Sequence, residues 1–296
     1  MTDLLDAATH MDTLTLHVGD LAEMESYYSS ALALTPMSQG GGEVLLGRGS
    51  QGIIRLVHTP GLPQPSRRQA GLFHTAMLLP DQATLAATVL AAAQDSRSRF
   101  AGSSDHHVSE AFYFTDPEGN GIELYYDRPR ELWTGADGSI HMTTEYLDPQ
   151  NYLATHLNES VVAGVTGAPA QVGHIHLQVG DLETAESFYV DALGFEITTR
   201  YPGALFVSAG GYHHHMAMNV WNSAGAPARA ATLGLGEVAI TVPDRADVEA
   251  TAARLRHFGH TVADDGASIV VADPWGSAVR LSPAVATNGA TAHTGA

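Results

Sequence analysis

The chain of 296 residues is long enough for about two domains, and its 44% hydrophobic and 16% charged residues allow a substantial core. All 14 basic residues are Arg; the lack of Lys excludes Schiff-base chemistry and a P-loop, and the lack of Cys excludes thiolate metal sites and disulfides. A net charge of −18 argues against nucleic acid and anionic membranes as partners. The acidic N-terminus has no apolar signal core, so we expect a cytoplasmic protein.

Four copies of one strand–helix–strand pattern follow one another along the chain. The first copy, near residues 11–60, has an alternating strand, the sequence GDL and a helix with paired aromatics, and the third copy, 172–222, repeats this order. The second and fourth copies, 71–127 and 233–283, each have a strand ending in Pro-Asp, an Ala-rich helix and a turn that begins with Asp-Pro. Each copy is predicted to be a βαβββ module.

The modules form two predicted domains, residues 11–127 and 172–283, joined by a connector over 128–171. The connector is rich in turn residues and is predicted to hold one short helix around Pro149–Leu157, whereas the tail 284–296 is predicted to be disordered. A βαβββ module leaves half of its sheet uncovered, so two modules must pair. We therefore expect an α+β fold of four tandem modules, paired into two cup-shaped half-barrel sheets whose concave faces are candidate sites.

The stretches GHIHLQVGDLETAESFYVDALGF and DPEGNGIEL resemble the vicinal oxygen chelate superfamily, which includes glyoxalase I, bleomycin-resistance proteins and type I extradiol dioxygenases. Two further stretches, HHVSEAFYFTDPEGNGIELYYDRP and GGYHHHMAMNVW, are similar to bacterial catechol 2,3-dioxygenases. The resemblance covers nearly the whole chain apart from the connector and tail. Because the superfamily hosts lyases, dioxygenases and metal-free binders, the resemblance is more specific for fold than for function.

The resemblance implies metal ligands on the first and last strands of a module. In this chain the first-strand positions are Thr13, His74, His174 and Glu237, and the last-strand positions are Glu123 and Arg280. Thr is a weak ligand and Arg is a permanent cation, which leaves His74, Glu123 and His174. Two imidazoles and one carboxylate with open positions form the facial set of non-haem Fe(II) oxygenases. A lone His on a strand is often structural, but three ligand types at equivalent repeat positions favour a site.

These ligands come from modules two and three, whereas the familiar extradiol enzymes use modules three and four. We infer that modules two and three share a cup, and that modules one and four pair without a metal, with Glu237 and Arg280 forming a salt bridge. The alternative pairs module one with two and three with four. It would separate His174 from the other two ligands, unless His58 or Asn219 completed each set.

The run HHHMA matches the HHxxA stretch of extradiol dioxygenases, with His214 at the position of the acid–base residue. We expect the run to lie on a strand, where successive side chains alternate between faces. Either His214 alone, or His213 and His215 together, would then face the cup. We assign His214 to acid–base catalysis, and His213 and His215 to substrate binding.

Tyr113 precedes Glu123 at the spacing of the family's oxyanion-stabilising Tyr. His106 or His107 is similar to the family's His that comes before this Tyr. We assign His106 to catalysis beside Tyr113, and His107 to substrate binding. A solvated polar loop is the alternative interpretation of the two His residues.

The resemblance implies an Fe(II)-dependent extradiol dioxygenase that inserts O2 into a catechol-type aromatic diol during aromatic hydrocarbon catabolism, with Mn(II) as the alternative ion. One other interpretation is a glyoxalase-like metal-dependent lyase or isomerase, which would normally need two carboxylates. Another is a metal-free small-molecule binding protein of the bleomycin-resistance type, which would not need the three ligands. Closed symmetry favours an even-numbered homo-oligomer.

Overall fold

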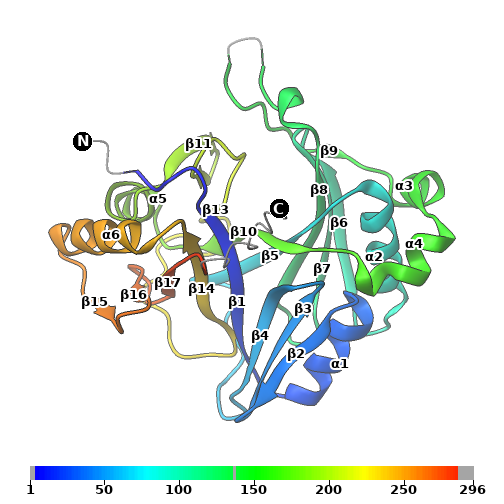
Figure 1. Cartoon of the computed structure of the whole chain (residues 1–296), viewed down its shortest axis with the longest axis horizontal. Helices are drawn as coiled ribbons and strands as arrows, with labels where there is room; N and C mark the ends of the chain where they lie inside the picture. The colour runs from blue at the N-terminus through cyan, green and yellow to red at the C-terminus, as the bar shows by residue number, and fades with distance from the viewer. Residues whose placement is uncertain (1–3, 136–137, 286–296) are drawn as a thin grey trace, which may run out of the picture.

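The computed structural model describes residues 4–135 and 138–285, and the four predicted βαβββ modules are present in it (Figure 1). The first module consists of β1 (His10–Val18), α1 (Leu21–Ala31), β2 (Thr35–Gly40), β3 (Glu43–Arg48) and β4 (Gln51–His58). The second consists of β5 (Gly71–Leu79), α2 (Gln82–Gln94), β6 (Arg99–Asp105), β7 (Ser109–Thr115) and β8 (Gly121–Asp127).

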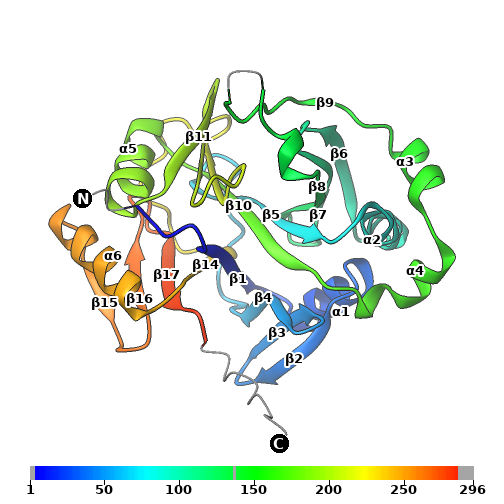
Figure 2. The same ribbon diagram turned by 45° about the horizontal axis from the view of Figure 1, so that its top comes forward.

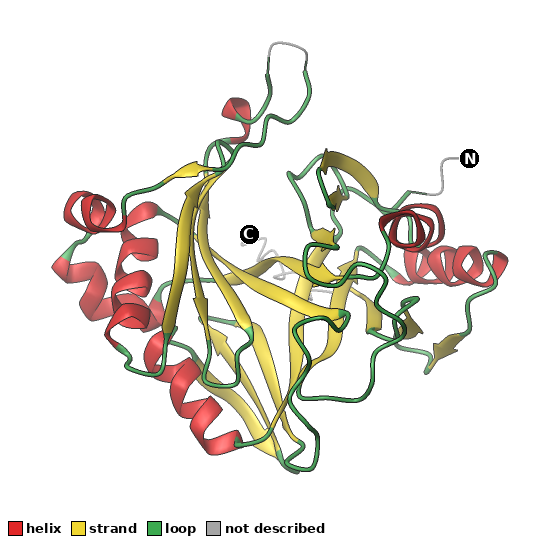
Figure 3. Ribbon diagram, turned by 180° about the vertical axis from the view of Figure 1, so that it is seen from behind, coloured by secondary structure: helices red, strands yellow, loops and turns green. Residues whose placement is uncertain are grey.

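The second half repeats this order of elements. The third module consists of β10 (Gln171–Gln178), α5 (Leu182–Glu186) with the π-helical segment η3 (Ser187–Ala192), β11 (Glu196–Tyr201), β12 (Ala204–Ser208) and β13 (Met216–Asn219). The fourth consists of β14 (Gly234–Val242), α6 (Arg245–His257), β15 (Val262–Asp264), β16 (Ile269–Ala272) and β17 (Ala278–Pro283). Figure 3 shows the helices at the periphery and the strands of both sheets in the interior.

Two curled sheets result because module two pairs with module three and module one pairs with module four. The nine-stranded sheet has the order β11-β12-β13-β10-β5-β8-β7-β6-β9 and joins modules two and three through antiparallel β5 and β10. The eight-stranded sheet has the order β15-β16-β17-β14-β1-β4-β3-β2 and joins modules one and four through antiparallel β1 and β14. The inferred pairing of module two with module three is confirmed, and the alternative pairing is wrong.

The four module helices begin at the Asp residues that close the first strands. In each helix the Asp carboxylate accepts a hydrogen bond from a backbone N–H two or three residues further on, which satisfies a donor that the first turn leaves unpaired. These capping residues are Asp20, Asp81, Asp181 and Asp244. The paired aromatics on the first and third helices are fully buried against their sheets, as the repeat predicts.

The connector has more structure than its sequence predicts. It contains η1 (Arg130–Leu132), β9 (Glu145–Tyr146), α3 (Pro149–His156), α4 (Glu159–Gly164) and η2 (Val165–Gly167). Strand β9 pairs with β6 at the edge of the nine-stranded sheet, and α3 and α4 pack against α2. Figure 2 shows this segment passing around the outside of module two before it returns to the centre as β10. None of the helices in the described part of the chain is both long and apolar enough to cross a membrane.

The expectation that His213, His214 and His215 lie on a strand is wrong. Strand β13 begins only at Met216, and the three His residues form the turn that leads into it. Strict alternation of faces therefore does not apply to them. The predicted disordered tail falls mostly outside the described residues, since residues 286–296 are not described.

Candidate metal centre and its cavity

Three adjacent strands at the centre of the nine-stranded sheet carry His74, Glu123 and His174. The strands lie in the order β10-β5-β8, and Ala76 of β5 pairs with Glu123 on one side and with His174 on the other. A small side chain at this central position leaves the space between the two neighbours open. The register therefore brings three residues that are far apart in sequence onto one face of the sheet.

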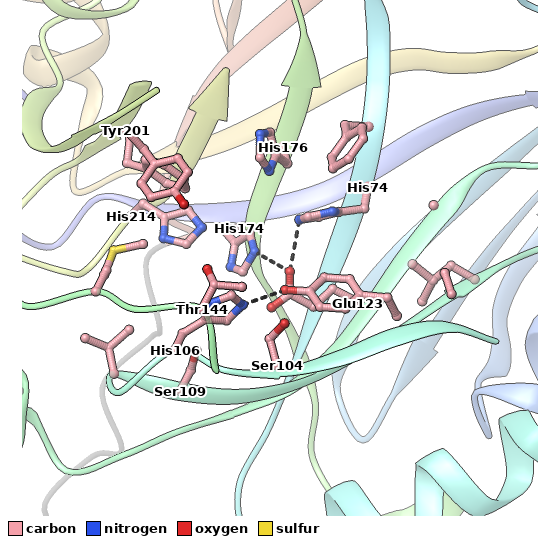
Figure 4. Close-up of a pocket in the computed structure, with 18 of the residues that line it drawn as sticks. His74, Ser104, His106, Ser109, Glu123, Thr144, His174, His176, Tyr201 and His214 are labelled. Atoms are coloured by element: carbon pink, nitrogen blue, oxygen red, sulfur yellow. Dashed lines mark hydrogen bonds and ion pairs between the residues drawn. The ribbon is translucent and has the colours of Figure 1, made fainter. Parts of the chain in front are cut away.

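The ligand atoms of the three residues converge. His74 Nε2 lies 2.9 Å and His174 Nε2 lies 3.0 Å from the same carboxylate oxygen, Oε2 of Glu123. One ligand atom from each residue lies within 4.8 Å of the others, and all three side chains are buried. Two ligand atoms that each lie about 2 Å from one ion are at most about 4 Å apart, so both nitrogens lie close enough to Oε2 of Glu123 to share one ion with it. Figure 4 shows both imidazoles directed at the carboxylate.

The directions in which the pKa values of Glu123 and His174 are shifted suit a metal ion. Burial alone would raise the pKa of Glu123, but His174 and His74 beside it hold that pKa well below its ordinary value. Burial lowers the pKa of His174, although Glu123 acts in the opposite direction. Neutral imidazoles and an ionised carboxylate are the forms that bind metal.

Two buried nitrogens of the centre are also left without hydrogen bonds. His174 Nδ1 makes none with the described residues. His74 Nε2 makes none either, although it lies only 2.9 Å from Oε2 of Glu123. A buried polar atom without a partner is costly, on the order of 1–3 kcal/mol. A metal ion would satisfy His74 Nε2, so the residues fit such an ion.

The centre opens into a cavity of about 450 Å³ on the concave face of the sheet. Its walls come from modules two and three and from the connector, and they are mostly apolar or aromatic. The residues predicted for chemistry that line it are His74, His106, Tyr113, Glu123, His174 and His214. The structure therefore brings the predicted ligands and the predicted catalytic residues together around one space.

Tyr113 and His106 form a hydrogen-bonded pair at the edge of this cavity. His106 Nδ1 donates to the backbone carbonyl of Thr143 at 2.7 Å, since a carbonyl can only accept, and its Nε2 lies 2.7 Å from the Tyr113 hydroxyl. Burial and the charge of Glu123 raise the pKa of Tyr113 well above its ordinary value. Tyr113 therefore keeps its proton and can serve as a hydrogen-bond donor.

His214 lies on the other side of the ligands. The centroid of its ring is 4.0 Å from that of His174, and its Nδ1 is 2.9 Å from Nδ1 of His213. Burial and the surrounding His residues lower its pKa well below the ordinary value, so His214 is neutral in the metal-free protein. A neutral imidazole at the cavity wall is able to accept a proton.

The other three His residues assigned to substrate lie outside the cavity lining. His213 is fully buried and binds Asp127, and His215 accepts a hydrogen bond at Nδ1 from the backbone N–H of Ala209. His107 is exposed and packs against the ring of His141. None of these three side chains belongs to the cavity lining, and each of them has a partner elsewhere.

The sequence interpretation missed His176, which lines the cavity one alternation beyond His174. Its Nε2 accepts a hydrogen bond from Nδ2 of Asn219 at 2.9 Å, and burial lowers its pKa well below the ordinary value. Period-two alternation in the sequence HIH could have identified it, because residues two apart on a strand share a face. The wall residues from the connector, Met142 to Thr144, carried no comparable signal.

The equivalent positions in modules one and four hold an ion pair. Arg280 donates from Nε and from a terminal nitrogen to the two carboxylate oxygens of Glu237, at 2.8 and 2.9 Å. The predicted salt bridge is therefore confirmed. A carboxylate already engaged by a guanidinium has little capacity left for a dication.

Comparison with known proteins agrees with this fold. Residues 171–281 match the family described as the glyoxalase/bleomycin resistance protein/dioxygenase superfamily. The chain is 35% identical over 274 residues to the catechol-2,3-dioxygenase of Bacillus subtilis (strain 168), which covers 90% of this chain and 94% of that relative. The chain therefore belongs to the glyoxalase/bleomycin resistance protein/dioxygenase superfamily.

Solved structures show the same fold at low sequence identity. A putative dioxygenase from Bacillus subtilis superposes with a TM-score of 0.62 at 14% identity, covering 93% of this chain and 84% of that one. Glyoxalase I from Zea mays superposes with a TM-score of 0.57 at 15% identity, covering 93% and 92% of the two chains. Because both a dioxygenase and a glyoxalase match, these structures support the architecture alone.

Proposed function

We propose that this protein is an Fe(II)-dependent extradiol dioxygenase that inserts both atoms of O2 into a catechol-type aromatic diol. The observation that carries the proposal is the buried set of His74, Glu123 and His174, which converges at the wall of a cavity large enough for an aromatic ring. Two imidazoles and one carboxylate with open positions are typical of non-haem Fe(II) oxygenases. The name of the Bacillus subtilis relative supports the same activity.

Fe(II) held by His74, Glu123 and His174 would supply Lewis acidity toward the diol oxygens and redox chemistry toward dioxygen. His214, neutral and at the cavity wall, accepts the proton of a diol hydroxyl and returns it to an oxygen as the ring opens. The apolar walls exclude water from the reacting atoms.

Tyr113 donates a hydrogen bond from its hydroxyl to the oxyanion of the bound diol. Its hydroxyl also lies 2.7 Å from His106 Nε2, and one proton cannot serve both partners fully. With its N–H proton at Nδ1 used by the carbonyl of Thr143, His106 can only accept at Nε2, so its hydrogen bond with Tyr113 is released when Tyr113 turns its proton toward the substrate. The carbonyl of Thr143 holds the opposite side of the His106 ring in place for this exchange.

The cavity favours this activity over a glyoxalase-like isomerisation. Among the described residues that line it, Glu123 is the one carboxylate, whereas proton transfer between two carbons of a chelated substrate would normally use two. The concentration of neutral His residues around the ligands instead suits a catecholate bound to a single cation. Mn(II) is the alternative ion, since the same ligand types bind it.

The test is reconstitution of metal-free protein with Fe(II) under anaerobic conditions, followed by catechol and dioxygen. We expect one iron per chain, oxygen uptake equal to catechol consumed, and a yellow ring-opened product. The His74→Ala variant, carried through the same steps, should give neither iron nor product.

Two other results would contradict the proposal in different ways. Iron retained without oxygen uptake across a series of catechols would point to a lyase or isomerase. Failure to retain any divalent metal would point to a metal-free binding protein.

A further inference from the structure

Behind His214 lies a chain of buried and partly buried side chains that the proposed chemistry does not use. Asp127 ends the ligand strand β8, and its Oδ1 accepts a hydrogen bond from Nε2 of His213 at 2.7 Å. Its second oxygen, Oδ2, accepts from the hydroxyl of Tyr212 at 2.7 Å. The Nδ1 of His213 in turn lies 2.9 Å from the Nδ1 of His214. The hydrogen-bonded chain therefore runs from the carboxylate of Asp127 through the imidazole of His213 to the imidazole of His214, which lines the cavity.

The chemistry of these atoms restricts how they can be arranged. An ionised carboxylate only accepts, so the proton on the far side of the His213 ring must be on Nε2. The two Nδ1 atoms then share one hydrogen bond, which turns the Nδ1 edge of His214 toward His213. The opposite edge of His214, with Nε2, is thereby directed away from His213 and is free for the cavity that His214 lines.

His213 is itself held firmly. It has no exposed surface, and its ring packs at centroid distances of 4.2 Å from Tyr212, 5.0 Å from Trp133 and 6.1 Å from Tyr125. His214, by contrast, lies in the turn before β13, where no sheet register fixes the direction of its side chain. A reactive group in such a turn needs a fixed neighbour if it is to keep one rotamer.

We infer that Asp127 and His213 are a positioning pair that sets the orientation of His214 and so aims its Nε2 into the cavity. Neither residue lines the cavity, so both act through His214. The inference rests on the proposed function for the role of His214, but the arrangement of the three side chains is independent of it. It also accounts for the run of three His: His214 faces the cavity, His213 orients it, and His215 binds the neighbouring backbone.

The test compares three variants, each loaded with Fe(II) and assayed with catechol. Asp127→Ala removes the hydrogen-bond acceptor of His213 and should lower kcat by about tenfold or more. This loss is part of the roughly 10²–10⁴-fold that a placed acid–base group contributes. KM and iron content should stay within about twofold of the wild-type values. Asp127→Asn keeps an oxygen acceptor and should restore kcat to within about threefold of the wild type. Tyr212→Phe is the matched control, because it removes a hydrogen bond to the same carboxylate but keeps an aromatic ring against His213. This variant should have a lower melting temperature and an unchanged kcat.

A second readout does not depend on activity. Metal-free protein labelled with ¹⁵N in its His rings should show a solvent-protected imidazole N–H proton from His213. That signal should persist in Tyr212→Phe and disappear in Asp127→Ala.

The inference is overturned if Asp127→Ala keeps the kcat of the wild type, if Asp127→Asn is as impaired as Asp127→Ala, or if Tyr212→Phe lowers kcat to the same extent. Absence of the protected proton from the wild type would also overturn it. Failure of the proposed function is a different result, because the wild type would then be inactive while the NMR signal and its dependence on Asp127 remained.

Discussion

His74 and His174 each present a buried Nε2 to the same oxygen of Glu123, and the proposed iron site therefore depends on both imidazoles. Changing either residue to Ala leaves two ligands, too few to hold a divalent ion firmly. We expect iron to fall from about one ion per chain to near none, as measured by elemental analysis after desalting. His257→Ala, at an exposed position at the end of α6, is the control and should keep its iron. Undiminished iron in both ligand variants would refute the assignment.

His214 differs from the ligands in what its loss should change. It faces the cavity but lies outside the set of three converging ligand atoms, so His214→Ala should bind iron normally. Turnover should fall by on the order of a hundredfold or more, the usual contribution of a placed acid–base group. Parallel measurements of iron content and kcat distinguish a catalytic role of His214 from a role as a metal ligand. Equal losses of metal and of activity would make His214 a ligand.

At the level of elements, the repeat predicts the modules well because its signals are local. The capping Asp of each helix and the alternating first strands lie within short segments, and they place His74 and His174 at equivalent positions. The pairing of modules followed from chemistry, since only modules two and three unite the three ligands. The turn holding His213 to His215 could not be predicted, because its shape depends on contacts with Asp127 and Val207 from other strands. The connector residues near Thr143 reach the cavity for similar non-local reasons.

Strands β14 and β17 carry the ion pair that occupies the ligand positions of the second sheet. Removing the guanidinium in Arg280→Ala leaves Glu237 without its bidentate partner. Because both side chains are partly exposed, the cost should be about 1 kcal/mol, which corresponds to a fall of roughly 2–4 °C in melting temperature. Iron content and the KM for catechol should not change.

The companion variant for this pair is the double change Glu237→Gln with Arg280→Ala. It removes the unpaired carboxylate and should recover part of the lost stability. A second iron per chain in the wild type, or a loss of activity in Arg280→Ala without a loss of stability, would show that the second sheet has a role beyond structure.

At the scale of the whole molecule, the charge of the chain and the composition of the cavity restrict the substrate. The net charge is −18, and none of the described residues that line the cavity is an Arg. A carboxylate on the aromatic ring would therefore be buried without a cationic partner, at a cost of several kcal/mol. We expect kcat/KM for 3,4-dihydroxybenzoate to be lower than for its uncharged methyl ester by on the order of a hundredfold or more. Equal or better use of the acid would contradict this selectivity.

The three converging residues and the cavity belong to one of the two sheets, and we propose that dioxygen is inserted into a diol ring in this cavity. In the most direct measurement, the Fe(II)-loaded protein is given catechol and ¹⁸O2, and the mass of the product is determined by mass spectrometry. We expect a ring-opened product whose formula is that of catechol plus O2, carrying two ¹⁸O atoms before exchange with water. A product without ¹⁸O, or one in which the ring remains closed, would contradict it.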